Sequence, residues 1–481
     1  MRLGRLLWCA IWWVAIATLA ARGTQPNIVV FLVDDLGARD VGCFGSTFYE
    51  TPRIDRVARE WMRFTAAYAA CPVCSPTRAS MMTGKYPQRT GITDYINTRG
   101  TNQPDKWPRN TRLLPAPYSD HLALSERTIA EVLRDAGYAT FFAGKWHLGG
   151  DGFLPSNQGF EINKGGMEWG SPKSYFSPYR NRLLADGPKG ESLTLRLGEE
   201  TCKFIESNRD HPFFAYLSFY SVHIPLEARE DLVAKYKAKA EKLTTPKQEW
   251  GKERQSKVRL VQNNPVYAAM IEETDTAIGN VLDKLDKLGL AKNTLVLFTS
   301  DNGGLSTAEG HSTSNLPLRG GKGWMYEGGI RVASIVRWPG VVKPGSESAT
   351  PIISNDYFPT FADAADAKLS GEKIDGESLT PLFRGEEIAD RALYWDYPHY
   401  GNQGGAPASA IRQGKWKLIE WREDGSRELF NLDEDPGELK NLADDQPELV
   451  TVLLAKLSNW RAEVGAKKLE SNPRYTTAVR E

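Results

Sequence analysis

Four apolar segments recur along the chain, and each of them leads into polar residues. Their apolar positions are continuous and do not alternate with polar ones, which is typical of strands buried on both faces, as in a parallel sheet. These segments are residues 27–33, 139–143, 213–219 and 294–300. The pattern predicts four central strands with polar residues beyond their carboxyl ends.

Apolar residues at three-to-four spacing predict helices between these strands. One helix is expected over 126–136 with Ser125 as its N-cap, and a longer one over 267–288 that stops at Gly289. Strands and helices in alternation favour a doubly wound α/β fold with a large, mostly parallel sheet flanked by helices. Ligands of such sheets bind beyond the carboxyl ends of the strands, where the polar residues fall.

Beyond about residue 391 the pattern changes to short alternating segments. Strands are expected at 392–397, 408–412, 416–421 and 428–431, with a hairpin turn at 423–426 and a helix over about 447–464. This predicts a small antiparallel sheet with one helix. Because a single core rarely exceeds roughly 250–300 residues, we divide the chain into a large α/β domain with the candidate chemistry at 25–384 and a small C-terminal α+β subdomain at 385–481.

The first 21 residues predict a signal peptide. Arg2 and Arg5 precede an apolar run from Leu6 to Ala21, which ends in small residues. The run is shorter than the roughly 20 residues that a membrane-spanning helix needs. We therefore expect an exported protein, periplasmic or secreted, with no stable membrane insertion after signal removal.

Composition excludes several classes of partner and scaffold. The 60 Lys and Arg residues balance 60 Asp and Glu residues, so no basic field indicates nucleic acid. Five cysteines, one of them in the signal peptide, are too few for a disulfide framework. A basic segment at 229–259 is compatible with a docking strip for a polyanionic polymer, but a solvated helical hairpin is the simpler interpretation.

Oxygen ligands follow two of the predicted strands. Asp34 and Asp35 come after the first strand, and Asp301 and Asn302 come after the last. Three carboxylates and an amide select a hard cation, Ca²⁺ or Mg²⁺, over zinc. Each pair alone is compatible with a cap or a turn, but both pairs at matching strand ends favour a metal site.

Basic and imidazole side chains follow the other strands or lie among glycines. Lys145 and His147 are alternate residues of an extended segment, so both can face one anion. Lys322 lies in a glycine-rich segment that permits close approach to an anion. His223 is a candidate general acid, because histidine titrates near neutrality unaided. Alternatively, Lys322 is an ordinary surface lysine and His223 is a structural histidine.

The most specific motif is Cys74–Arg78, Cys-Ser-Pro-Thr-Arg, followed by Met81–Lys85. It resembles the maturation signature of type I sulfatases, in which the cysteine is oxidised to formylglycine. One hydroxyl of the hydrated aldehyde can attack a sulfate ester, and the second can then expel the sulfate. Alternatively, Cys74 is a buried thiol ahead of a helix. Arg78 lies one helical turn from Cys74 if a helix starts at Pro76.

Further motifs follow one another along the chain in the same order as in this family. The chain thus resembles type I sulfatases of the alkaline phosphatase superfamily over essentially its whole length after the signal peptide. These motifs are Asp34-Asp35, Gly144–Gly149, Val222–Pro225, Asp301-Asn302-Gly303 and Gly320–Arg331. The resemblance implies a maturation enzyme that generates formylglycine as a partner.

The resemblance also implies a role for each candidate residue. It implies that Ca²⁺, in preference to Mg²⁺, is bound by Asp34, Asp35, Asp301 and Asn302. Formylglycine at Cys74 would be the nucleophile, and Arg78 would steady its diol. The sulfate would be held by Lys145 and Lys322. His147 would help deprotonate the sulfated diol, and His223 would protonate the leaving oxygen.

A sulfated carbohydrate is the expected substrate. The loop 398–405 resembles those of secreted bacterial sulfatases that act on carbohydrate sulfates, and its polar and aromatic residues suit a sugar pocket. We expect a galactose or N-acetylgalactosamine sulfate, with the ester at the 4-position, and we expect His311 to border the pocket. Alternatively, this loop only packs the small subdomain onto the large domain.

Two other functions stay open at this stage. The first is a phosphonate or phosphate ester hydrolase of the same superfamily, although the sequence shows no further Asp/His set to hold a second ion about 4 Å from the first. The second is a catalytically inactive secreted glycan-binding protein, which would require an unconverted Cys74 or a lost lysine.

Overall fold

The computed structural model describes residues 25–244, 248–369, 371 and 373–476, and the predicted signal peptide lies outside the described residues. A large sheet forms the centre of this part of the chain, with the strand order β10-β2-β9-β8-β1-β5-β3-β4 and with β11 paired to β2. Its strands are β1 (Asn27–Val33), β2 (Met62–Tyr68), β3 (Ala139–Gly144), β4 (Ile162–Lys164), β5 (Phe213–Ser218), β8 (Thr294–Ser300), β9 (Arg331–Arg337), β10 (Glu347–Ser348) and β11 (Ile352–Ile353).

The four predicted central strands are neighbours and run parallel in the order β8-β1-β5-β3. Phe31 of β1 pairs with Leu217 of β5 on one side and with Phe298 of β8 on the other. Strand β9 is antiparallel to both β8 and β2. The predicted fold class, a mostly parallel sheet flanked by helices, is confirmed.

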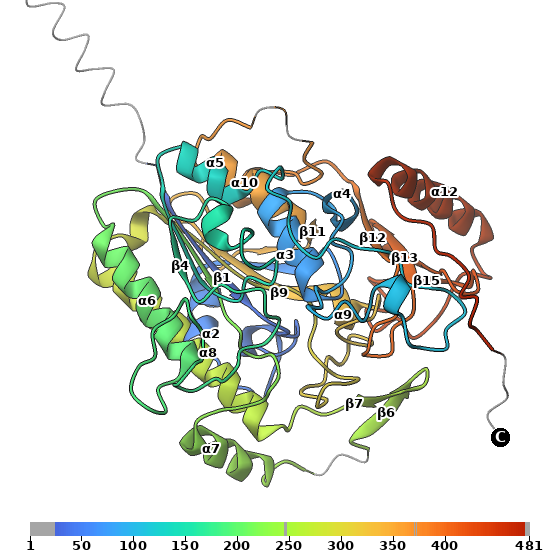
Figure 1. Ribbon diagram of the computed structural model, residues 1–481, viewed down its shortest axis with the longest axis horizontal. Helices are drawn as coiled ribbons and strands as arrows, with labels where there is room; N and C mark the ends of the chain where they lie inside the picture. Colours follow the sequence, from blue (N-terminus) through green and yellow to red (C-terminus); the bar gives the residue numbers. More distant parts are fainter. Residues whose placement is uncertain (1–24, 245–247, 370, 372, 477–481) are drawn as a thin grey trace, which may run out of the picture.

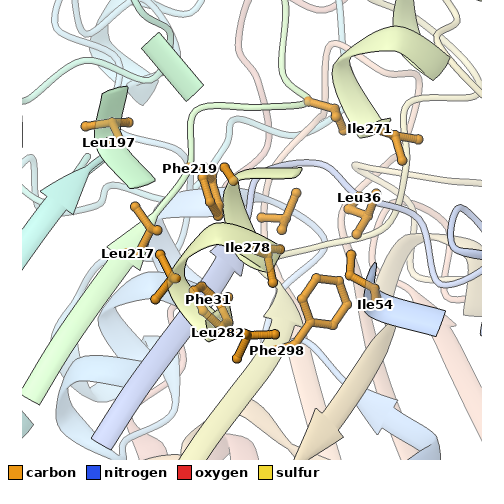
Figure 2. Packing of buried hydrophobic residues seen from close by; sticks show 14 of the residues in the cluster. Phe31, Leu36, Ile54, Leu197, Leu217, Phe219, Ile271, Ile278, Leu282 and Phe298 are labelled. Carbon is orange, nitrogen blue, oxygen red and sulfur yellow. The ribbon is translucent and has the colours of Figure 1, made fainter. Parts of the chain in front are cut away.

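Helices cover both faces of the sheet (Figure 1). Successive residues of β1 alternate between the faces: Phe31 packs with α2, α6 and α8, whereas Val30 packs with α3, α5 and α10. Figure 2 shows Phe31 and Phe298 next to Ile278 and Leu282 of α8. The α-helices are α2 (Pro52–Glu60), α3 (Cys74–Thr83), α4 (Pro87–Thr90), α5 (Ile129–Asp135), α6 (Leu193–Ser207), α7 (Glu230–Ala240), α8 (Pro265–Lys287), α9 (Glu327–Ile330), α10 (Tyr357–Ala364), α11 (Thr380–Phe383) and α12 (Pro447–Val464).

Two local predictions were wrong. Helix α5 begins at Ile129, not at residue 126, because Thr128 and Glu131 form a capping box: the Glu131 N–H donates to Thr128 Oγ1 (3.2 Å) and the Thr128 N–H donates to the Glu131 carboxylate (2.8 Å). The segment 229–259 is not a helical hairpin. After α7 it forms the antiparallel pair β6 (Trp250–Glu253) and β7 (Ser256–Arg259), in which the Lys257 ammonium lies 3.7 Å from the centre of the Trp250 ring.

The C-terminal part forms the predicted small antiparallel sheet, in the order β12-β13-β14-β15. Its strands are β12 (Ala392–Tyr397), β13 (Ala408–Gln413), β14 (Trp416–Trp421) and β15 (Arg427–Asn431). Helix α12 covers this sheet at one end of the molecule (Figure 1). The hydrophobic cluster beneath it also includes Tyr68, Trp324 and Tyr326 of the large unit. The division at residues 384 and 385 stays a prediction. Among the described residues, no helix is long and apolar enough to cross a membrane.

Candidate active site

The candidate residues meet at one edge of the large sheet. Strands β8, β1, β5 and β3 all end there, so the residues that follow them lie close together: Asp301 and Asn302, Asp34 and Asp35, His223, and Lys145 and His147. The antiparallel strand β9 begins at this edge, which places the preceding loop with Lys322 there. Strand β2 ends at the same edge and leads into α3, whose first residue is Cys74.

The three aspartates form a buried acidic cluster. One carboxylate oxygen from each of Asp34, Asp35 and Asp301 lies within 4.8 Å of the other two. Asn302 Nδ2 donates to Asp35 Oδ1 (2.8 Å), and the Asp35 N–H donates to Asp301 Oδ1 (3.1 Å). Within the described part of the chain, Asp34 Oδ1 and Asn302 Oδ1 are buried and accept no hydrogen bond. Unsatisfied oxygens in an all-oxygen donor set fit a hard cation such as Ca²⁺.

A basic side chain neutralises each carboxylate. Lys145 Nζ lies 2.6 Å from Asp34 Oδ2, and Lys322 Nζ lies 2.8 Å from Asp35 Oδ2. Although burial opposes ionisation, Lys322 holds the pKa of Asp35 below its usual range. Burial raises the pKa of Asp34 well above its usual value; Lys145 opposes this, and the charges of Asp301 and Asp35 add to it.

Arg78 supports the acidic cluster. Its guanidinium is buried, and it donates to Asp301 Oδ2 from Nε (2.8 Å) and to the Lys145 carbonyl and Ser218 Oγ from Nη1 (2.8 and 2.7 Å). Burial opposes ionisation of Asp301, but Arg78 holds its pKa below the usual value. The guanidinium is therefore fixed on Asp301, and its predicted role toward the nucleophile stays a prediction.

Cys74 faces a histidine whose tautomer is defined by its other partner. Cys74 Sγ lies 3.3 Å from His147 Nδ1, and His147 Nε2 lies 2.8 Å from the Ile96 carbonyl oxygen. Because a carbonyl only accepts, Nε2 carries the proton and the Nδ1 lone pair points at residue 74. Burial lowers the pKa of His147 well below its usual value, so the ring is neutral.

Two glycines permit the close backbone approaches at this site. Gly144 has φ +101°, and a Cβ there would lie 1.8 Å from the carbonyl oxygen of Ser218, to which the Lys145 N–H donates (2.8 Å). A Cβ on Gly321 would lie 2.5 Å from the Gly304 carbonyl oxygen. Each glycine therefore lets the lysine that follows it approach the cluster.

His223 lies next to Asp35. Its Nε2 lies 3.5 Å from Asp35 Oδ2, and its Nδ1 lies 2.8 Å from the Ile224 carbonyl oxygen and 3.1 Å from Ser171 Oγ. Burial, followed by repulsion from Lys322, lowers the pKa of His223 to about 3. The free ring is therefore neutral, with Nδ1 donating to the carbonyl.

A pocket of about 440 Å³ opens above these residues. Cys74, His147, His223 and Lys322 lie at its base, and the loop 398–405 contributes Asn402 and Gln403. Ile224 of the Val222–Pro225 motif also lines it. The remaining wall comes from residues that the sequence did not single out: Tyr95, Ile96, Asn97, Thr98, Arg99, Thr101, Trp169, Gly170, Ser171, Lys173 and Glu309. His311 is not among the lining residues, contrary to expectation, and it packs edge-on against Trp250 instead.

Glu309 is the most notable of the missed residues. Its Oε2 lies 3.8 Å from Lys322 Nζ, and its Oε1 accepts from Asn402 Nδ2 and from Gln403 Nε2 (3.1 Å). Oxygen and nitrogen atoms of Asp35, His223 and Glu309 lie within 4.8 Å of one another, so a second group of possible ligands exists where the sequence showed none. The Lys322 ammonium lies next to two of these three residues. The only indication in the sequence was that Glu309 is an acidic residue in the loop between Asn302 and Lys322.

Comparison with known proteins identifies the family. The family model for sulfatases matches residues 26–367. The chain belongs to the sulfatase family. A second model, for the C-terminal region of N-sulphoglucosamine sulphohydrolase, matches residues 321–463 of this sulfatase. The predicted family and the predicted enzyme class, a sulfuric ester hydrolase, are thereby confirmed.

Curated relatives support the same assignment along most of the chain. A sulfatase of Formosa agariphila is 33% identical, with 90% of this chain and 88% of the relative covered. The N-acetylgalactosamine-6-sulfatase of Rattus norvegicus is 32% identical, with 88% and 77% covered, and the steryl-sulfatase of the same organism is 32% identical, with 76% and 72% covered. These relatives differ in the substrates that their names state, so the family alone leaves the substrate open.

Solved structures share the fold. The crystal structure of Ps i-CgsB, also solved in complex with k-i-k-neocarrahexaose, superposes with a TM-score of 0.75 at 28% identity, with 91% of this chain and 93% of the other covered. BT4656, solved in complex with D-glucosamine-2-N,6-O-disulfate, has a TM-score of 0.73 at 20% identity, with 92% and 99% covered, which shows the fold alone.

Proposed function

We propose that this sulfatase removes sulfate from a sulfated carbohydrate, with formylglycine at position 74 as the nucleophile and a Ca²⁺ ion held by Asp34, Asp35, Asp301 and Asn302. One observation carries the proposal: residue 74 lies at the base of a pocket, faces the free lone pair of a neutral histidine, and is surrounded by two lysines and a buried acidic cluster.

Unmodified Cys74 is poorly suited to be the nucleophile. Burial raises the pKa of its thiol, so the side chain is protonated near neutral pH, and a thiol is far less nucleophilic than a thiolate. Conversion to formylglycine would replace the thiol with a hydrated aldehyde at the same position. His147 Nδ1, 3.3 Å from Cys74 Sγ, would then accept a proton from a hydroxyl of residue 74.

The lysines and the acidic cluster provide the charge that a sulfate ester requires. When bound, Ca²⁺ would supply positive charge to the sulfate oxygens and to the nucleophile. Lys322 lines the pocket, and Lys145 is fully buried beside Asp34; their ammonium groups would hold the sulfate. His223 lines the same pocket. Because its free ring is neutral, it would take up a proton at Nε2 when the anionic ester binds and would then donate that proton to the leaving oxygen.

The carbohydrate class is supported by the wall of the pocket and by the relatives. Thr98, Thr101, Asn402 and Gln403 present hydroxyl and amide groups, and Trp169 provides an aromatic ring, which together suit a sugar. Relatives include an N-acetylgalactosamine-6-sulfatase, and Ps i-CgsB has been solved in complex with k-i-k-neocarrahexaose. A galactose or N-acetylgalactosamine sulfate is the proposed substrate.

Mass spectrometry with fragmentation of the tryptic peptide Phe64–Arg78 tests the nucleophile. Conversion requires a loss of roughly 18 Da at residue 74 and not at Cys71. Protein from its native source that retains an intact thiol at residue 74 while hydrolysing sulfate esters would contradict the proposal. A Cys74→Ala variant provides the matched control, because it should lose turnover of 4-methylumbelliferyl sulfate and of sulfated galactosides.

A further inference from the structure

The exposed charged residues at the mouth of the pocket are positive, although the chain as a whole is neutral. The chain as a whole is neutral, with 60 basic and 60 acidic residues. Five of the pocket-lining residues are exposed, and the two charged ones among them are both cationic: Thr98, Arg99, Thr101, Lys173 and Asn402. We name Arg99 and Lys173 the basic rim. A substrate that enters the pocket passes these two charges first.

Both cations of the basic rim are available to a charged partner. In the described ranges of the chain, no carboxylate forms an ion pair with the side chain of Arg99 or Lys173. Most other basic residues around the site are paired, as Lys145 and Lys322 are with aspartates. An anion that enters the pocket would give these two cations an opposite charge to pair with.

Both cations extend from ordered segments. The Arg99 N–H donates to Asn97 Oδ1 (2.9 Å), and Asn97 Nδ2 donates to Thr101 Oγ1 (2.9 Å), which fixes the turn that carries Arg99. The Lys173 ammonium lies 4.6 Å from the centre of the Trp169 ring, and Trp169 also lines the pocket. Ordered cations lose less conformational entropy when they bind an anion.

We propose that the basic rim binds a second anionic group of the substrate, a sulfate or a carboxylate beyond the ester that is cleaved. The substrate class is then an oligosaccharide with at least two acidic groups, and a neutral steroid or a singly sulfated alcohol leaves the rim unused. This inference rests on the proposed function for the position of the cleaved ester, and it adds the requirement for a second charge.

Sucrose octasulfate is a suitable probe, because it presents sulfate groups in many directions on a small sugar, and inorganic sulfate is the single-anion comparison. Affinities are measured by isothermal titration calorimetry with Ca²⁺ present, and binding to the pocket is the part that saturating inorganic sulfate displaces. The full-length chain is compared with the double variant Arg99→Gln/Lys173→Gln and with Lys189→Gln, a matched variant at an exposed lysine outside the pocket lining.

The double variant should bind sucrose octasulfate about tenfold more weakly than the unmodified chain, since two exposed ion pairs with the probe are lost. The affinity of the double variant for inorganic sulfate should differ from that of the unmodified chain by less than about threefold. Lys189→Gln should bind both probes with the affinity of the unmodified chain. Equal octasulfate affinities for the unmodified chain and the double variant would overturn the proposal, as would equal losses for both probes.

The outcome separates this proposal from the proposed function. If a chain with confirmed formylglycine hydrolyses no sulfate ester, the proposed function fails, while the octasulfate titration still reports on the rim. If turnover is present and the double variant binds octasulfate normally, only the rim proposal fails. The circular dichroism spectra and melting temperatures of the variants show whether they fold.

Discussion

Addition of Ca²⁺ should stabilise the folded chain by an amount that the acidic cluster allows us to estimate. Asp34 Oδ1 and Asn302 Oδ1 are buried without a hydrogen-bond donor from the described residues, and the charges of Asp301 and Asp35 add to burial in raising the pKa of Asp34. A bound cation would satisfy these oxygens and reduce the repulsion between the carboxylates. Because the unfolded chain has no such cluster, binding favours the folded state.

The expected size follows from mass action. A ligand at a hundred times its dissociation constant stabilises the folded state by about 2.7 kcal/mol. The entropy of unfolding near the melting temperature is about 2.1 cal/mol/K per residue, which is roughly 1 kcal/mol/K for the 481-residue chain. Dividing the stabilisation by this entropy predicts that the melting temperature rises by about 3 °C. Mg²⁺ at the same concentration should give a smaller shift, since it releases its water less readily.

Differential scanning fluorimetry with Ca²⁺, Mg²⁺ or EGTA measures this shift. Asp301→Asn removes one carboxylate and should abolish most of the calcium-dependent increment, whatever its own effect on stability. Asn302→Ala retains the charge and should reduce the increment partly. Asp283→Asn removes an exposed partner of Arg53 (2.7 Å) and is the matched control that should keep the full shift. A shift of the same size in Asp301→Asn, or no EGTA-reversible shift in the unmodified chain, would refute the assigned metal site.

Three further predictions use other parts of the structure. Glu309→Gln should tighten binding of inorganic sulfate about twofold to tenfold, measured as a competitive inhibition constant, because a carboxylate 3.8 Å from Lys322 is neutralised; weaker binding would contradict this. His147→Ala should accumulate sulfate on the peptide Phe64–Arg78, visible by mass spectrometry, because the Nδ1 base is lost. Burial, with repulsion from Glu327, raises the pKa of Glu438 from 4.5 to about 7. The folded state therefore binds a proton that the unfolded state has lost, and the free energy of unfolding falls as the pH rises from 4.5 to about 7. Glu438→Gln should lessen the accompanying fall in melting temperature.

The fold was largely predictable because its central strands are buried on both faces. Residues 27–33 and 294–300 contain apolar runs that a solvated element could not maintain, and both form the expected strands. The start of α5 was not predictable to the residue, since Ser125 and Thr128 are both good caps and only Thr128 has a glutamate three positions later. The hairpin at 250–259 was missed because its charges obscured a short alternating pattern.

The site was predictable where motifs follow strands and unpredictable where loops build the wall. Asp34 and Asp301 follow neighbouring parallel strands, so topology alone brings them together. Arg99 and Lys173 have no motif, and the pocket joins them only through the tertiary arrangement of two separate loops. His311 was expected at the pocket, but Glu309, two residues earlier in the same loop, lines it instead. Both residues have positive φ and lie in an irregular loop, where no regular period fixes which way a side chain points.

The small C-terminal sheet contributes to the active site through a buried ion network. Lys417 of β14 is fully buried and lies 3.0 Å from Glu327 Oε1 and 2.8 Å from Glu438 Oε1. Glu327 begins α9, directly after the loop that carries Lys322. Without Lys417, Glu327 would be a buried carboxylate that lacks its principal partner, and breaking such a pair typically costs about 3–5 kcal/mol. The loop that places Lys322 beside Asp35 therefore depends on the small sheet, so the candidate active site relies on both parts of the chain for its structure.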